Sequence, residues 1–273
     1  MLDCNLKDNS LIQINIEGKI GEIEGTPSEA SVWADKLKAS LARAVYVGVG
    51  LPLEMWANKK KEEQRKRISE AVDRNAASIP PECRIEPTFG EVRAIVNGLE
   101  GCIDEELLEN GFINLLEASM DSRRASGLIK NYAVVLNQLC PDEAKILSYV
   151  FSVRTFPVLK IKEIIEDSSY SEIASHVTNL DQDVELQYPK ELQLYLEHLQ
   201  TLGLLEISWS GTIANEECYE KVMQSPSVVN FKRSYEEKGK VLTFSKGYLS
   251  VTHFGDGFAR ACRFAAKGAK KDS

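Results

Sequence analysis

The sequence predicts a mainly α-helical protein, in which an N-terminal helical bundle precedes a winged-helix-like α+β region with a small antiparallel sheet. Helix start signals stand at Ser28, Asp104 and Pro141. Apolar residues recur at helical spacing over much of the first half, whereas strand-like runs cluster after residue 203. We expect a strand or hairpin segment over 1–26, a helical domain over 27–140 and a winged-helix-like domain over 141–273, with an insertion at about 207–240.

Composition limits the classes of function. The chain has 273 residues with 43% apolar and 27% charged residues, which favours packed globular domains. The net charge of −8 opposes nucleic-acid binding except through a local basic patch. Six scattered cysteines without a CxxC pair indicate free thiols in a reducing cytoplasm. Three histidines without ligand spacing predict no metal, and no cofactor is expected.

The N-terminal segment predicts a short strand, a helix and an apolar run. The alternating isoleucines of LIQINIEGKIGEIEG (11–25) indicate a short strand or hairpin, and a helix capped by Ser28 follows. The N-terminus lacks the basic start and long apolar stretch of a secretory signal. The apolar run from Ser40 to Trp56 is interrupted by charges and a proline and is shorter than the roughly 20 residues that span a bilayer. We expect it to pack in the core, with membrane-surface binding as the alternative.

The segment 58–74 is rich in lysine, glutamate, glutamine and arginine and predicts a helix with a thin buried stripe. Six basic residues lie within its positions 59–67: Lys59, Lys60, Lys61, Arg65, Lys66 and Arg67. We expect a solvated helix face, and the alternative is a patch that binds phosphate or anionic lipid. The three prolines of IPPECRIEP (79–87) then predict an extended connection.

A second set of helices is predicted after residue 88. The first places Phe89, Val92, Ile95, Val96 and Leu99 on one face, and Asp104 caps the next. That next helix should stop near 121–124, within the stretch NLLEASMDSRRAS (114–126). Arg123 and Arg124 suit the negative end of its dipole, with phosphate or partner binding as the alternative. Further helices are expected over 128–139 and from Pro141.

The second half predicts three helices, over 142–151, 160–166 and 189–202, followed by strands. The strands are GLLEISW (203–209) and two more on either side of Ser245-Lys246-Gly247, and a final helix closes the chain. This order is typical of a winged helix. Residues 142–202 carry eleven acids against five bases, however, so protein contact is favoured over DNA docking.

The sequence offers no recognised catalytic motif. It lacks phosphate-binding glycine loops, a nucleophile elbow and a zinc-binding HExxH helix. Capping explains the acids at 104–106, and a capping or packing role is expected for His253. No enzyme is therefore indicated.

Five landmarks occur in a fixed order: IPPE (79–82), ELLENGFINLLEASMDSRRAS (106–126), LNQLCPDEAKIL (136–147), LQTLGLLE (199–206) and LSVTHFGDGFARAC (249–262). Together they resemble the abortive infection alpha (Abi-alpha) family, a bacterial domain of formerly unknown function, over about 56–264. The sequence departs from the family pattern at Glu117 and at Cys140, where serine is usual. The resemblance implies a role in bacterial defence against phage, and it brings no catalytic residues.

Three functional hypotheses remain. The first is a cytoplasmic, non-enzymatic anti-phage protein that acts through a protein partner or as a homo-oligomer. The second is a winged-helix nucleic-acid-binding regulator that uses the 59–67 patch or the basic C-terminal helix, with Arg260, Arg263, Lys267, Lys270 and Lys271. The third is a membrane-surface effector, in which residues 41–56 insert and the lysines contact anionic lipid.

Overall fold

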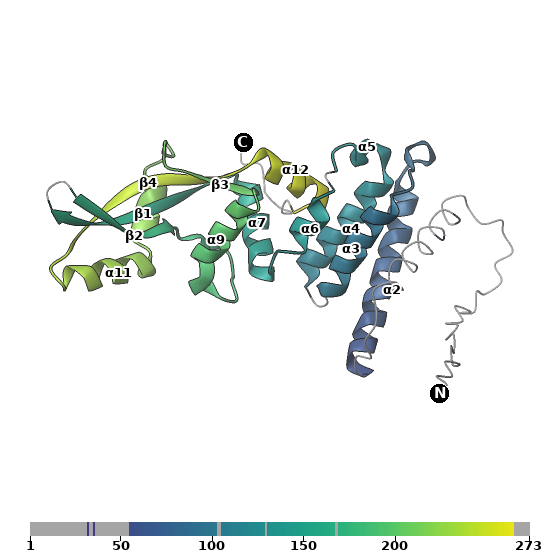
Figure 1. Ribbon diagram of the computed structural model, residues 1–273, viewed down its shortest axis with the longest axis horizontal. Helices are drawn as coiled ribbons and strands as arrows, with labels where there is room; N and C mark the ends of the chain where they lie inside the picture. Colours follow the sequence, from purple (N-terminus) through teal and green to yellow (C-terminus); the bar gives the residue numbers. More distant parts are fainter. Residues whose placement is uncertain are drawn as a thin grey trace, which may run out of the picture.

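The computed structural model describes residues 55–102, 105–128, 130–166 and 169–264, together with Val32 and Asp35. Within these residues the fold is α+β and elongated. Helices α2 to α6 lie at one end, a long antiparallel sheet lies at the other, and α7, α9 and α12 lie between them (Figure 1). The strand predicted over 1–26 lies outside the described residues, and Val32 and Asp35 are helical.

The helical end begins with α2 (Met55–Ser78) and continues through the single 3-10 turn η1 (Pro81–Cys83) to α3 (Phe89–Gly101). The predicted helix within 58–74 and the proline-rich break are therefore confirmed. A capping box starts α3, because the Thr88 hydroxyl accepts the backbone N–H of Glu91 and the Glu91 carboxylate accepts the N–H of Thr88. Phe89 was predicted on the buried face, but it is 55% exposed because it stands in the first turn of the helix.

Helix α4 (Glu106–Met120) is the central helix of this end. Helices α2, α3 and α6 (Tyr132–Leu136) pack around it, and the short helix α5 (Ser122–Ala125) follows it directly. The helix predicted over 128–139 is thus confirmed only in its middle. Next comes α7 (Pro141–Val153), which starts at the predicted proline.

The sheet has the strand order β2-β1-β4-β3 within the described residues, with every pair antiparallel. Its strands are β1 (Thr155–Glu166), β2 (Ser169–Val177), β3 (Leu205–Ser208) and β4 (Val241–Val251). The helix predicted over 160–166 is wrong, because this segment pairs with β2 on one side and β4 on the other. Two strands were predicted around 245–247, but β4 runs through them without a turn.

Between β2 and β3 lie α8 (Leu180–Asp183), η2 (Pro189–Glu191) and α9 (Leu192–Thr201). Helix α9 packs on α7, β2 and β3. The predicted helix over 189–202 and the strand within 203–209 are confirmed. Gly203, between them, has a φ of +73°, which glycine adopts without steric cost.

The predicted insertion contains two helices, α10 (Glu217–Met223) and α11 (Pro226–Glu236), which contact β1 and β4 respectively. They build a second, smaller buried cluster that includes Leu159 and Ile161 from β1 and Tyr219 and Val222 from α10. The Tyr219 hydroxyl donates to the carbonyl of Gly247 at 2.9 Å and accepts the N–H of Ile213 at 2.8 Å. The insertion is therefore fixed to the sheet by burial and by hydrogen bonds.

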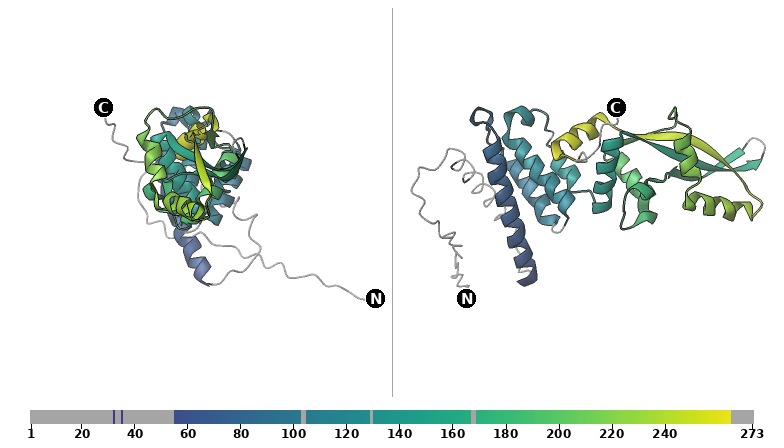
Figure 2. Two further views of the ribbon diagram at one scale, coloured as in Figure 1. Left: turned by 90° about the vertical axis from the view of Figure 1, so that its left-hand side faces the viewer. Right: turned by 180° about the vertical axis from the view of Figure 1, so that it is seen from behind.

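The main core is continuous from the helical end to the sheet. It contains Phe112 of α4, Leu147 of α7, Leu196 of α9, Leu249 of β4 and Phe258 of the last described helix. That helix, α12 (His253–Cys262), packs against α4 and α7 although it follows the sheet in the chain (Figure 2). The division into domains over 27–140 and 141–273 stays a prediction.

Candidate functional site at the junction of α4, α5 and α12

The end of α4 is set by Asp121. Its backbone is extended, with φ −114° and ψ 113°, and it forms an isolated bridge with Arg84. The Asp121 carboxylate then caps α5 by accepting the backbone N–H of Arg123 at 3.0 Å. The two arginines therefore belong to a new helical turn and do not lie at the end of α4, where the sequence placed them.

Arg123 is paired locally. Its Nε donates to Asp121 Oδ1 at 2.9 Å and its Nη2 donates to Oδ2 at 2.6 Å. Hydrogen bonding from this guanidinium holds the pKa of the Asp121 carboxyl below its ordinary value. The Arg123 side chain is 55% exposed while the Asp121 carboxylate is buried, so this pair marks the edge of the site.

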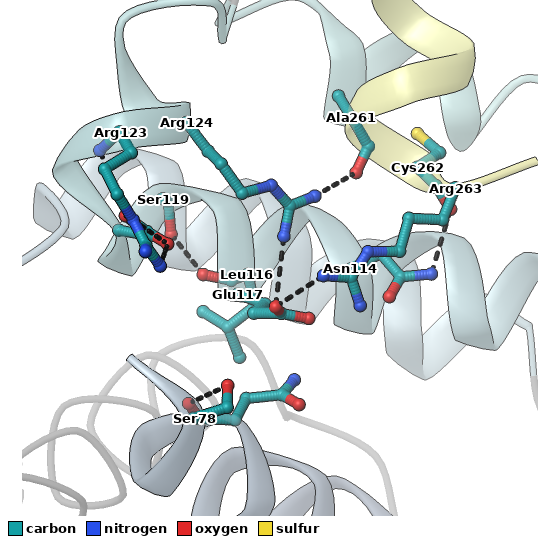
Figure 3. Close-up of polar contacts among 12 residues, drawn as sticks. Ser78, Asn114, Leu116, Glu117, Ser119, Arg123, Arg124, Ala261, Cys262 and Arg263 are labelled. Carbon is teal, nitrogen blue, oxygen red and sulfur yellow. Dashed lines mark hydrogen bonds and ion pairs between the residues drawn. The ribbon is translucent and has the colours of Figure 1, made fainter. Parts of the chain in front are cut away.

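Arg124 points the other way, toward α12 (Figure 3). Its Nη1 lies 3.1 Å from Glu117 Oε1 and its Nη2 donates to the carbonyl of Ala261 at 3.4 Å. The Nη2 of Arg263 also donates to Glu117 Oε1, at 2.7 Å. Two guanidinium groups from separate elements therefore share one buried carboxylate oxygen.

The end of α12 brings Arg263 into this position. Arg263 has a φ of +54°, a left-handed conformation that terminates the helix. Asn114 of α4 donates to the carbonyl of Cys262 at 2.9 Å, which fixes the same turn. The stretch 114–126 thus contacts α12 and its C-cap residue Arg263 through Asn114, Glu117 and Arg124.

The arrangement carries an excess of positive charge at a partly open surface. Arg263 is 53% exposed and Arg124 is 24% exposed, whereas Glu117 is buried. Burial lowers the pKa of Arg124, and the neighbouring Arg263 lowers it further, against the opposing effect of Glu117. Glu117 Oε2 has no hydrogen-bond partner among the described residues. Chemically, the exposed guanidinium edges can bind a phosphate or a carboxylate, and the cluster contains no nucleophile beside a base.

The second predicted set of basic residues lies on α2. The side chains of Lys59, Lys60 and Lys61 lie outside the described part, although their backbone is helical. Arg65 and Lys66 are exposed. Arg67 instead forms a bidentate pair with the buried Glu109 of α4, at 2.9 and 2.8 Å. Arg67 therefore joins α2 to α4, whereas Arg123 and Arg124 lie at the junction of α4, α5 and α12.

The start of α7 is a second polar cluster, formed by the acids of the PDEA stretch. Asp142 accepts the backbone N–H groups of Gln187 and Tyr188, both at 2.9 Å. Glu143 Oε1 lies 2.6 Å from His198 Nδ1, and Glu143 Oε2 accepts the N–H of Cys140 at 2.9 Å. Both acids are buried, so they tie α9 and the loop before it to α7.

The remaining reactive groups are dispersed. In the described part of the chain, no three His, Cys, Asp or Glu side chains lie together as metal ligands would. The five cysteines from Cys83 onward are unpaired. His253 is exposed and begins α12, while the preceding Thr252 supplies the cap by accepting the N–H of Gly255 at 2.8 Å.

The sequence interpretation missed the partners of Arg124. Glu117 was noted only as a departure from the family pattern, and Arg263 only as part of a basic C-terminal helix. The two residues are 146 positions apart, so no local spacing indicates their contact. An acid in the middle of an otherwise apolar helix face was the one available signal, because such a group is rarely buried without a partner.

Comparison with known proteins gives one family and one distant structural likeness. The family model described as abortive infection alpha matches residues 57–262. No curated protein matches the chain. A solved structure of an uncharacterized protein from the hydrocarbon-degrading marine bacterium Alcanivorax borkumensis SK2 is 18% identical. It covers 52% of this chain and 96% of its own, with a TM-score of 0.33.

Proposed function

The chain belongs to the abortive infection alpha family, and we propose that it acts in bacterial defence against phage through contacts with a protein partner. The observation that carries this proposal is the family match over residues 57–262, which includes nearly all of the described fold. Abortive infection is a response in which infected cells stop growth or die before the phage matures.

The family landmarks support a scaffold role for the residues that define them. Asn114 joins α4 to α12, and Asp121 joins α4 to α5. Asp142 and Glu143 join α7 to the loop before α9 and to α9 itself. Each of these polar groups is used inside the molecule. We therefore infer that the surface that contacts a partner lies outside these contacts between helices.

We interpret α2 to α6 as a helical bundle and the following part as a winged-helix-like unit. In that unit α7, α8 and α9 are the three helices, and β1, β4 and β3 form the sheet in that spatial order. Strand β2 and the insertion with α10 and α11 are additions to it. This interpretation makes α9 the counterpart of a recognition helix.

The exposed residues of α9 and of the turn before it favour a protein over DNA as the partner. Tyr188 and Leu194 are 58% and 59% exposed, and the acids Glu191 and Glu197 are exposed beside them. Apolar side chains rimmed by acids suit a protein surface, whereas phosphates would be repelled. Within residues 188–201, Lys190 is the one exposed base.

Plaque assays test the proposal. Deleting the gene should raise plaque formation by a sensitive phage, and restoring it should reverse the effect. We expect Tyr188→Ser combined with Leu194→Ser to lose protection, while Val134→Ser, which removes a 47% exposed apolar residue on α6, keeps it. Unchanged plaque numbers across a broad phage panel after deletion would remove the proposal.

Nucleic-acid binding is the second candidate, because Arg65 and Lys66 stand exposed on α2 beside further lysines. A gel-shift titration in which binding falls steeply with salt would support it, and no shift at low salt would exclude it.

Membrane-surface binding is the third candidate, and the segment 41–54 that it needs lies outside the described residues. None of the described helices combines the length and apolar character needed to cross a bilayer. Co-sedimentation with liposomes that contain or lack anionic lipid separates this candidate from the other two.

A further inference from the structure

A pocket of about 420 Å³ opens between α4, α7 and the end of α8. Leu107, Tyr149 and Val184 supply apolar walls, and Ser148 lies on the side formed by α7. This volume is within the range of sites that take small molecules or a few side chains. The pocket is separate from the arginine cluster, which lies at the opposite end of α4.

Two acids line this pocket. Asp183 and Glu185 are exposed there. The only base in the lining, Lys145, is already bound, because its Nζ lies 3.5 Å from Asp142 Oδ1 and donates to the carbonyl of Glu185 at 3.0 Å. The pocket therefore presents carboxylates beside apolar walls, which suits a lysine whose aliphatic stem is buried and whose ammonium stays at the rim.

The last described residue lies beside this pocket. The Ser148 hydroxyl donates to the carbonyl of Phe264 at 2.9 Å. On the α4 side, a Cβ atom at Gly111 would lie 3.5 Å from the Phe264 ring. Gly111 is one helical turn from Leu107 on the same face of α4. Phe264 therefore sits between α4 and α7, one turn from the pocket.

We propose that the segment 265–273, AAKGAKKDS, docks in this pocket through its lysines. An extended chain advances at most about 3.6 Å per residue, so Lys267 reaches about 10 Å from Phe264 and Lys271 about 25 Å. Both distances exceed the helical turn of about 5.4 Å along α4 from Gly111, beside the Phe264 ring, to Leu107 in the pocket wall. The segment carries three lysines and one aspartate and complements the two rim carboxylates.

Tethering favours this occupant over a free basic peptide. A segment attached one helical turn away is present at an effective concentration in the millimolar range, without any new contact. A second copy of the chain could offer the same lysines, and the experiment therefore separates contacts within one chain from contacts between chains.

Zero-length carbodiimide coupling of the full chain tests the proposal. Equal amounts of unlabelled and ¹⁵N-labelled protein are mixed, coupled at low and at high salt, digested and read by mass spectrometry. We expect Lys267, Lys270 or Lys271 to be linked to Asp183 or Glu185 in peptides of a single isotope. High salt should reduce this yield, because the pairs lie at the surface.

Tryptic cleavage after Lys267, Lys270 and Lys271 of the segment 265–273, called the tail below, provides a second readout. Asp183→Asn combined with Glu185→Gln should raise the cleavage rate roughly fivefold, as expected for the loss of two rim ion pairs. Glu236→Gln combined with Glu237→Gln removes the same charge at the end of α11 and should leave the rate unchanged. All four acids are exposed, so both variants are expected to fold, and circular dichroism checks this.

Each other outcome overturns the proposal. Links found only between chains of different isotope would mean that the tail of a second copy occupies the pocket. An absence of links, or equal cleavage rates in the wild type and in the Asp183 and Glu185 variant, would mean that the tail is not docked.

Discussion

Replacing Glu117 by glutamine tests whether the shared carboxylate holds the junction of α4, α5 and α12. The substitution keeps the shape of the side chain and removes its charge. Arg124 and Arg263 would then face each other near an uncharged amide, and Arg124 is the more buried of the two. We expect the free energy of unfolding to fall.

The size of the effect follows from burial. Removing one partner of a fully buried pair costs about 3–5 kcal/mol. Here the arginines are 24% and 53% exposed, so water screens part of the uncompensated charge. We therefore expect a loss of about 2–3 kcal/mol for Glu117→Gln, and about 1 kcal/mol for Arg263→Ala, which leaves Arg124 in place.

Urea unfolding followed by circular dichroism measures these differences. Arg124→Ala combined with Arg263→Ala should cost more than the sum of the two single substitutions, because only the double variant leaves Glu117 without any cation. A change below about 0.5 kcal/mol for Glu117→Gln, or additive costs in this cycle, would refute the reasoning.

Three further predictions concern single residues. Arg123 lowers the pKa of Asp121 in the folded state, so the charged carboxylate stabilises the wild type above the unfolded pKa near 3.8. Asp121→Asn should therefore be less stable than the wild type above this pH, and the difference should vanish as pH falls through the folded pKa. Unfolding curves measured across this pH range check the prediction. Gly255→Ala places a Cβ against the carbonyl oxygen of Leu204 and should lower the free energy of unfolding by at least about 2 kcal/mol, measured by thermal melting. Gly90→Ala, where a Cβ meets nothing within 4 Å, should raise it by up to about 1 kcal/mol. Tyr219→Phe leaves the buried carbonyl of Gly247 and the half-buried N–H of Ile213 without their partner and should cost about 2 kcal/mol, and equal urea midpoints would contradict this.

Local sequence signals were sufficient to predict the helices that have a proline at a boundary or a regular apolar stripe. Pro141 occupies the first position of α7, as its fixed φ and missing donor require. The break at 79–87 followed from its prolines, and α4 followed from a regular apolar stripe. In these cases the local preference and the packed structure agree.

The prediction for 160–166 failed because the partners of the strand are remote in the chain. KIKEIIE contains good helix formers, yet Ile161 pairs with Phe244 and Glu163 pairs with Leu242. The alternation of Lys160, Ile161 and Lys162 already had the period of a strand. Tertiary pairing decided between the two preferences.

Gly247 was interpreted as a turn residue, but its role is close packing. A Cβ at this position would lie 2.5 Å from the Trp209 ring and 2.6 Å from the carbonyl oxygen of Ser208. Glycine is thus required by the neighbouring strand, and β4 continues through it. The role of Glu117 could not be predicted from local sequence either, because its partner Arg263 is 146 residues away in the chain.

The packing of α12 on α4 has a consequence for synthesis on the ribosome. The contact from Asn114 to Cys262 spans 148 residues, and Phe258 and Phe264 complete a core that α4 begins. While residues 253–264 are still being translated, the nascent chain exposes the apolar face of α4 that they later cover, a state prone to aggregation. Final compaction of the first half therefore waits until residues 253–264 have emerged, and truncation before 253 should yield aggregated protein.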